Sequence, residues 1–140
     1  MEKKVRSVQV LIVNWERPGD TIECIRSVMN SQRVAYSILL VDNGSRDDSV
    51  ARLNHLYPGT EVIRLPSNLG FAGGYNAGIK RFLASDSDYV FLLNNDTVIY
   101  PNTITTLVEG MQEWDVTVPK INFYDSPGIV WAAGKHCQGR

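Results

Sequence analysis

The sequence predicts an α/β domain with a mainly parallel sheet flanked by helices. Short apolar runs of strand length alternate strictly with segments whose apolar residues recur at helical spacing. Each of the first four runs ends in a polar or glycine-rich turn. Such alternation places strands side by side through right-handed crossovers. With 140 residues, 44% of them hydrophobic, the chain can bury one core, so we expect a single domain over residues 1–140.

Five apolar runs have the length and composition of buried strands. They cover residues 8–13, 38–41, 61–65, 89–93 and 116–121. The first run is a nearly continuous stretch of Val, Leu and Ile, as expected for a parallel strand covered on both faces. The segment after residue 121 fits no single element.

Four amphipathic segments separate these runs and predict helices. Asp20 with Glu23, and Ser45 with Asp48, have the spacing of helix-capping boxes, and Pro101 precedes the last helix. The apolar faces consist of Ile22, Ile25, Val28 and Met29; Val50, Leu53 and Tyr57; Tyr75, Ile79, Phe82 and Leu83; and Ile104, Leu107, Val108 and Met111.

Composition and charge argue against a nucleic-acid-binding protein and against a membrane-spanning one. The formal net charge of −1 gives no basic field for binding nucleic acid. No apolar run approaches the ~20 residues that span a bilayer. Cys24 and Cys137 lie far apart without metal-ligand spacing, so we expect free thiols in a reducing, cytoplasmic setting.

Polar and glycine-rich residues gather where the first four strands end. They are Asn14 after the first strand, Asp42, Asn43, Gly44 and Ser45 after the second, residues 68–78 after the third, and Asn94, Asn95 and Asp96 after the fourth. Ligands of open α/β sheets bind at the carboxyl ends of the strands. The coincidence of all four strand ends therefore predicts a binding site at this edge.

Each group has a functional and a structural interpretation, and its residues alone leave both open. Asp42 can accept hydrogen bonds from a ligand, or residues 42–45 can simply form a turn. The glycines of residues 70–78 can let a ligand approach the backbone, or they can allow a helix to pack tightly on the sheet. This segment matches neither the dinucleotide fingerprint nor a P-loop. Residues 94–96 can bind a hard divalent cation beside substrate phosphates, or form a turn.

Taken together, these segments resemble family 2 glycosyltransferases of the A-type fold. The similar runs are VLIVNW (10–15), LVDNGS (40–45), NLGFAGGYNAG (68–78) and LLNND (92–96), in order within residues 8–121. Their form is closest to that of bacterial rhamnosyltransferase-like members. The resemblance implies a Rossmann-like nucleotide-diphospho-sugar transferase fold. This chain would be its N-terminal donor-binding part, truncated at the C-terminus.

The resemblance also implies roles for the residues at the strand ends. The implied nucleotide-sugar contacts are Asn14, Asp42, Asn43, Gly44, Gly70, Gly73, Asn76, Asn94 and Asn95, and the implied metal ligand is Asp96. Asp42 stands where the family has the acid that contacts the nucleotide base. Residues 94–96 stand where the family has its Asp-x-Asp metal motif, with Asn94 in place of the first acid. Because an amide oxygen is a neutral ligand, Asp96 carries the assignment of a divalent metal, Mg²⁺ or Mn²⁺.

The implied reaction transfers a sugar from dTDP-rhamnose or a UDP-sugar to a glycan or lipid-linked acceptor, with inversion. The metal would stabilise the leaving diphosphate as a Lewis acid. In the family the catalytic base follows the metal motif, and the acids Glu109, Glu113, Asp115 and Asp125 do not match its context. We therefore expect the base beyond Arg140 and expect this fragment to be inactive alone.

The resemblance further implies a cytoplasmic enzyme of polysaccharide biosynthesis that associates with the inner face of the membrane. Apolar surface left by truncation would favour self-association.

Other classes fit the residues less well. A nucleotidyltransferase would need a glycine-rich basic loop after the first strand, where residues 14–18 hold one Arg and no Gly. A phospho-accepting receiver domain would need an acidic pair there, and Asn14 and Trp15 occupy those positions. A non-catalytic nucleotide-sugar-binding module stays open, because no base is visible.

Overall fold

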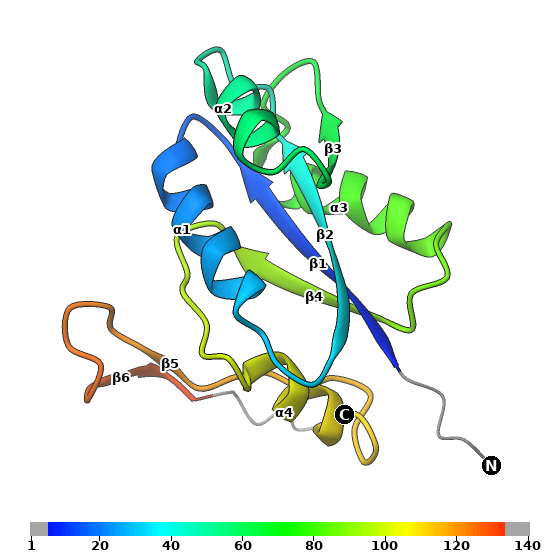
Figure 1. Cartoon of the computed structure of the whole chain (residues 1–140), viewed down its shortest axis with the longest axis vertical. Coiled ribbons are helices and arrows are strands. Elements are labelled where there is room, and N and C mark those ends of the chain that lie inside the picture. Colours follow the sequence, from blue (N-terminus) through cyan, green and yellow to red (C-terminus); the bar gives the residue numbers. More distant parts are fainter. Residues whose placement is uncertain (1–5, 134–140) are drawn as a thin grey trace, which may run out of the picture.

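The computed structural model describes residues 6–133, and Figure 1 shows a central sheet with helices packed against it. The sheet has four parallel strands in the order β3–β2–β1–β4. The strands are β1 (Ser7–Asn14), β2 (Ala35–Asp42), β3 (Glu61–Arg64) and β4 (Tyr89–Asn94). This arrangement confirms the predicted α/β class with a mainly parallel sheet.

The carboxyl ends of the strands lie level with one another because of the pairing register. Asn14 is opposite Asp42, which is opposite Arg64, and Asn94 is opposite Val13 on the other side of β1. The chain lays down β1, β2 and β3 in one direction and then crosses back to add β4 beyond β1. Open sheets of this kind bind ligands where the winding direction reverses, because the loops part there.

The helices cover both faces of the sheet and enclose two apolar clusters. They are α1 (Pro18–Met29), α2 (Ser49–Leu56), α3 (Gly70–Leu83) and α4 (Thr103–Gly110). The larger cluster joins α1, α2 and α4 to one face of the sheet and includes Ile12, Ile25 and Ile104. On the opposite face α3 packs on the sheet, with Tyr75 and Leu11 in the second cluster. Both faces of the central strands are therefore buried, as their continuous apolar composition predicts.

Two glycines let α3 approach the sheet closely. A Cβ at Gly78 would overlap the side chain of Leu11, and a Cβ at Gly74 would lie 2.8 Å from Cγ1 of Val13. A larger side chain at either position would push α3 away from β1. For these two residues the structure supports the packing interpretation of the glycine-rich segment.

Both predicted capping boxes are wrong. α1 begins at Pro18, a residue suited to the first turn, and α2 begins at Ser49, and neither helix has a side-chain cap. The Asp20 carboxylate instead accepts a hydrogen bond from Arg17 at 3.1 Å. Ser45 lies outside α2, and its hydroxyl is bonded within the polar network described below.

The predicted strand over residues 116–121 is also wrong. Only its last residue is in a strand, β5 (Ile121–Asn122), which pairs antiparallel with β6 (Val130–Ala132) in a separate small sheet. Val116 and Val118 are exposed, and Pro119 has no N–H to donate to a neighbouring strand. Within the described residues no strand runs beside 116–120, so these apolar side chains have no sheet to join.

Between residues 6 and 133, no helix combines the length and the apolar composition needed to cross a membrane.

Candidate functional site

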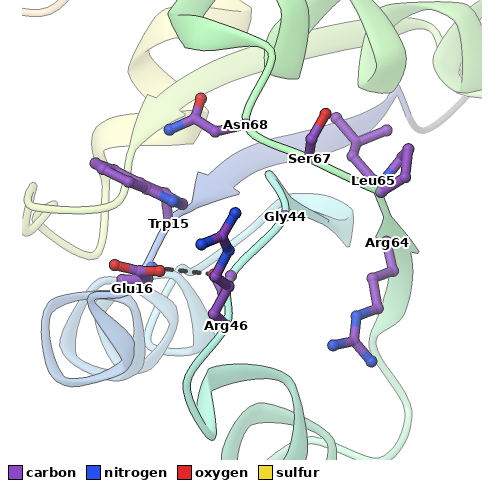
Figure 2. A pocket seen from close by; sticks show the side chains of 10 residues that line it. Trp15, Glu16, Gly44, Arg46, Arg64, Leu65, Ser67 and Asn68 are labelled. Carbon is purple, nitrogen blue, oxygen red and sulfur yellow. Dashed lines mark hydrogen bonds between the residues drawn. The ribbon is translucent and has the colours of Figure 1, made fainter.

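An open pocket of about 660 Å³ lies beyond the carboxyl ends of β1, β2 and β3. Figure 2 shows the side chains that line it, which come from the end of β3 and from the loops after these strands. Trp15 and Glu16 follow β1, Arg46 follows β2, and Arg64 is the last residue of β3. Among the nucleotide-sugar contacts that the resemblance implies, Gly44 alone lines this pocket, and Ser45 and Asn68 of the predicted strand-end segments line it as well. The pocket lies at the sheet edge where the sequence analysis expects a ligand, binding there stays a prediction, and mostly other side chains form the wall of the pocket.

Asn14 and Asp42 are buried side by side and share Ser45 as a partner. Both side chains are inaccessible to solvent. Asn14 Nδ2 donates to Asp42 Oδ1 over 3.1 Å and to Ser45 Oγ over 3.2 Å. The Ser45 hydroxyl donates to Asp42 Oδ1, and the Ser45 backbone N–H donates to Oδ2 over 3.2 Å. These donors offset the cost of burying the Asp42 carboxylate. Direct contact of Asn14 or Asp42 with a ligand stays a prediction.

The polar network continues through α1 to the end of β4. Thr21 Oγ1 donates to Asn14 Oδ1 over 2.7 Å and accepts a hydrogen bond from Asn95 Nδ2 over 3.1 Å. Asn95 is partly exposed at the turn after β4. One line of hydrogen bonds therefore joins the loops that follow β4, β1 and β2, although these loops are far apart in the sequence.

Asn43 fixes the loop that leads into α3. Its Nδ2 donates to Asn68 Oδ1 and to the carbonyl of Gly70, each over 3.0 Å. Its Oδ1 accepts a hydrogen bond from the backbone N–H of Leu69 over 2.9 Å. Asn43 is itself buried, so in this structure its amide holds the shape of the loop.

The predicted glycines and Asn76 lie around this loop and the first turns of α3. Gly44 and Gly70 have φ angles of +75° and +72°, which residues with a Cβ rarely adopt. A Cβ at Gly44 would overlap the backbone of Ser67, so the loops after β2 and β3 touch there. Gly70 has open space beside it, Gly73 is partly buried, and Asn76 is exposed on α3.

The polar residues after β4 lie on the other side of β1 from the large pocket. The Tyr75 hydroxyl of α3 donates to Asn94 Oδ1 over 3.1 Å. Asp96 is exposed and lines a smaller pocket of about 200 Å³ together with Asp20 and Glu23 of α1. In the part of the chain that the structure describes, no three His, Cys, Asp or Glu side chains converge to hold a metal. A cation at Asp96 would therefore need oxygen atoms from a substrate or water.

Two protonated groups lie behind this turn. Burial, and secondarily the charge of Asp96, raises the pKa of the Cys24 thiol to about 12. Burial, with smaller contributions from Cys24 and Asp96, also raises the pKa of Tyr75 to about 12. Tyr75 therefore remains a hydrogen-bond donor to Asn94 at neutral pH. Cys24 is a buried free thiol, and Cys137 lies outside the described residues.

Several residues of this region were not predicted from the sequence. Thr21 links the strand ends, Tyr75 binds Asn94, and Arg46 and Arg64 line the large pocket. Ser45 is expected at its strand end, but its bonds to Asp42 and Asn14 are not. Arg46 and Arg64 each lie beside a strand end that the sequence analysis expects to face a ligand. Their position in the sequence was therefore the signal that could have identified them.

Comparison with known proteins gives matches over most of the chain. The family model described as "Glycosyl transferase family 2" matches residues 9–136. A glycosyltransferase of Rickettsia felis is 31% identical over 108 residues, which cover 76% of this chain and 17% of that protein.

Two solved structures have a similar fold. The first is S. aureus TarS 1-349 in complex with UDP-GlcNAc, with a TM-score of 0.65 and 15% identity over 86% of this chain and 41% of that chain. The second is the mannosyltransferase PcManGT of Pyrobaculum calidifontis in complex with GDP-Man and Mn²⁺. Its TM-score is 0.61, with 15% identity over 73% of this chain and 31% of that chain. The matches thus cover less than half the length of each of these three proteins, and the similar structures confirm the predicted fold.

Proposed function

This chain belongs to glycosyltransferase family 2, and we propose that it binds the nucleoside-diphosphate sugar of a sugar-transfer reaction at the carboxyl edge of its sheet. The observation that carries the proposal is the level alignment of four polar strand ends beside an open pocket of about 660 Å³. A pocket of this size is in the range of small-molecule sites.

The proposed donor is dTDP-rhamnose or a UDP-sugar, and the proposed acceptor is a glycan or a lipid-linked glycan. The complexes of TarS with UDP-GlcNAc and of PcManGT with GDP-Man support a nucleotide sugar as the ligand of this fold. The base would occupy the large pocket, and the diphosphate would lie toward Gly70, Asn76 and the turn after β4. We propose that residues 1–140 form one donor-binding domain and that the whole enzyme works in the cytoplasm beside the membrane.

We propose Asp96 as the protein ligand of a divalent cation, Mg²⁺ or Mn²⁺. The residues present fit such an ion. Asp96 is an exposed carboxylate at the reversal point of the sheet, and the amide side chains of Asn94 and Asn95 directly precede it in the sequence. Magnesium usually takes one or two carboxylates and completes its shell with substrate phosphate oxygens and water. When bound, the cation would supply Lewis-acid stabilisation of the leaving diphosphate.

Inversion at the anomeric carbon is also proposed, and it requires a base that deprotonates the acceptor. The acids Glu109, Glu113, Asp115 and Asp125 are all exposed on α4 or the segment that follows it. We assign the role of base to none of them, and we expect these 140 residues alone to bind donor without turning it over. The family match sets aside the nucleotidyltransferase alternative, and a binding-only descendant is distinguished by whether the whole protein transfers sugar.

The direct test measures the Tm of the chain by thermal unfolding in the presence of UDP, dTDP and their sugars, with and without Mn²⁺. A ligand present at 100 times its Kd stabilises the native state by about 2.7 kcal/mol, which raises the Tm by several degrees. We expect Mn²⁺ to increase this shift, and we expect Asp96→Ala to abolish the increase.

Asp86→Ala is the matched control, because Asp86 is an exposed acid in the loop before β4, at the opposite edge of the sheet. It should leave the Mn²⁺ effect unchanged. If Asp96→Ala kept the same Mn²⁺ dependence as the unmodified chain, the metal assignment would be wrong. If no nucleoside diphosphate raised the Tm under any condition, the proposed donor site would be wrong.

A further inference from the structure

The end of β4 and the turn after it carry two amide side chains, and each is held from a different face of the sheet. Asn94 Oδ1 accepts a hydrogen bond from the Tyr75 hydroxyl of α3 over 3.1 Å. Asn95 Nδ2 donates to Thr21 Oγ1 of α1 over 3.1 Å. α1 and α3 cover opposite faces of the sheet (Figure 1). The two amides are therefore fixed in opposite senses, since Asn94 is bound through its oxygen and Asn95 through its nitrogen.

Tyr75 can hold the Asn94 side chain because the tyrosine ring is itself fixed. The ring is 6% exposed and packs in the second apolar cluster. Phe71 lies against it from the preceding turn of α3, with 4.7 Å between the ring centroids. The Asn94 backbone is fixed as well, because it pairs with Val13 and its carbonyl accepts a hydrogen bond from the Thr97 N–H over 3.2 Å. Both partners of the Tyr75–Asn94 hydrogen bond thus have defined positions.

The atom of Asn94 that remains for a ligand is Nδ2. Asn94 is exposed, and within residues 6–133 its Nδ2 has no hydrogen-bond partner. An amide NH₂ group is a donor only, so in this orientation it cannot bind a cation. It can donate to an anionic oxygen, and hydrogen bonds of that kind are roughly twice as strong as those between neutral groups.

The surroundings of Asn94 favour a phosphate oxygen as the acceptor. Asp96, two residues further on, is the proposed ligand of the cation, and magnesium usually completes its shell with phosphate oxygens. Tyr75 lies near the N-terminus of α3, whose first turn carries no acidic residue and whose partial positive charge attracts anions. A second carboxylate at position 94 would repel the diphosphate, whereas an amide adds a donor without charge.

We infer that Tyr75 is a positioning residue for donor binding, an inference that rests on the proposed function. Tyr75 fixes the Asn94 amide so that Nδ2 donates to an oxygen of the diphosphate, and it keeps the Asn94 oxygen away from the cation. Asn94 is therefore a contact of the diphosphate and not a ligand of the metal.

The first test measures the Kd of UDP by titration calorimetry, once with EDTA and once with Mn²⁺, with UDP raised to high concentration where binding is weak. Asn94→Ala removes the donor and should raise the Kd by roughly three- to tenfold in both solutions. The ratio of the Kd in EDTA to the Kd in Mn²⁺ should stay as in the unmodified chain, because the metal is not bound by Asn94. Asp96→Ala is the contrasting variant and should bring that ratio close to one.

Asn94→Asp identifies the ligand atom that faces Asn94. A carboxylate repels a phosphate oxygen, so in EDTA this variant should bind UDP more weakly than Asn94→Ala does. A ribose hydroxyl could instead donate to the carboxylate, and Asn94→Asp would then bind UDP more tightly than Asn94→Ala. That order of affinities would overturn the inference.

The role of Tyr75 is tested by combining variants. Tyr75→Phe keeps the ring and removes the hydroxyl, so the Asn94 amide can turn and the Kd of UDP should rise by roughly two- to tenfold. In the Asn94→Ala background the same change should have no effect, because no amide is left to orient. A general disturbance of the fold would weaken UDP binding in both backgrounds. Tyr57→Phe is the matched control, because the Tyr57 hydroxyl donates to the Ile22 carbonyl over 3.3 Å, and it should not change the Kd.

Three further results overturn the inference while the proposed function stands. They are a UDP affinity that Asn94→Ala leaves unchanged, a loss in Asn94→Ala that appears only with Mn²⁺, and equal effects of Tyr75→Phe in the two backgrounds. If UDP and dTDP bind the unmodified chain neither in EDTA nor in Mn²⁺, the proposed function itself fails.

Discussion

Replacing Ser45 with Ala tests how much the buried polar network contributes to the fold. The Ser45 hydroxyl donates to Asp42 and accepts hydrogen bonds from Asn14 Nδ2 at 3.2 Å and from the Glu16 N–H at 3.0 Å. Alanine fills nearly the same space and removes all three bonds. Since Asp42 and Asn14 are inaccessible, solvent does not simply take the place of the hydroxyl.

The magnitude follows from the kind of bond that is lost. A hydrogen bond to a charged group contributes roughly 1.5–3 kcal/mol, and a neutral one contributes about 1 kcal/mol. Asn14 Nδ2 keeps its hydrogen bond to Asp42 at 3.1 Å, so it loses only one of its two acceptors. We therefore expect Ser45→Ala to lower the free energy of unfolding by about 2–4 kcal/mol. Total stabilities of domains are only about 5–15 kcal/mol, so this is a large share.

Urea unfolding followed by circular dichroism measures the change, with the midpoint expected to fall by roughly 1–2 M at an ordinary m-value. Ser31→Ala is the matched control, because the Ser31 hydroxyl is buried without a hydrogen-bond partner among the described residues. Its removal should cost little or nothing. If Ser45→Ala were no more destabilising than Ser31→Ala, the network would contribute no net stability and the reasoning would be refuted.

Three other predictions concern the packing of α3 and the groups behind β4. Gly78→Ala should destabilise the protein by about 1–3 kcal/mol in a urea titration, because the added Cβ overlaps Leu11. Gly59→Ala is the control, because a Cβ at Gly59 has nothing within 4 Å. Equal effects of the two substitutions would contradict the close approach of α3 to β1. Burial raises the pKa of Cys24 from 9.0 and that of Tyr75 from 10.0, each to about 12. The unfolded chain therefore ionises first, so stability is complete below pH 9 and falls toward pH 12, by roughly 1 kcal/mol per pH unit and group. Urea titrations between pH 8 and pH 10.5 measure this fall, and Cys24→Ala should remove the part that begins near pH 9; a flat profile in the unmodified chain would argue against it. In a Cys137→Ser background, a thiol reagent at pH 8 should label Cys24 only as fast as the protein opens, and labelling as fast as in urea would show that the thiol is not buried.

The sequence predicts the main elements well because the central strands are buried on both faces. That burial leaves a nearly continuous apolar run in β1, a pattern that few other arrangements produce. The sequence predicts β2 only from residue 38, because Ala35 and Ser37 are exposed and join the strand only through pairing with β1. The wrong strand at 116–121 has the same origin, since a run of residues does not reveal whether a partner strand lies beside it.

The edge that carries the candidate site is predictable, but the use of each side chain is not. Ser45 has the spacing of a cap with Asp48, yet its hydroxyl bonds Asp42, the same distance away in the other direction. The Ser45 hydroxyl could either cap α2 or bond to Asp42, and it cannot do both. The register of β1 against β2 decides between these two hydrogen bonds. The glycines of residues 70–78 also differ in role. Gly74 and Gly78 allow α3 to pack closely on the sheet, whereas Gly70 has open space beside it.

The pairing of β4 with β1 has a consequence for how the chain acquires its structure. Val8 pairs with Tyr89 and Val13 with Asn94, so this side of β1 stays open until most of the chain has been synthesised. Before that moment β1, β2 and β3 can assemble, but the open edge of β1 presents unpaired N–H and C=O groups to other nascent chains. β4 then pairs with β1 and becomes the edge strand in its place, and Asn94, Asn95 and Asp96 arrive with it. The residues proposed to hold the metal therefore take their places beside β1 only after β1, β2 and β3 have been synthesised.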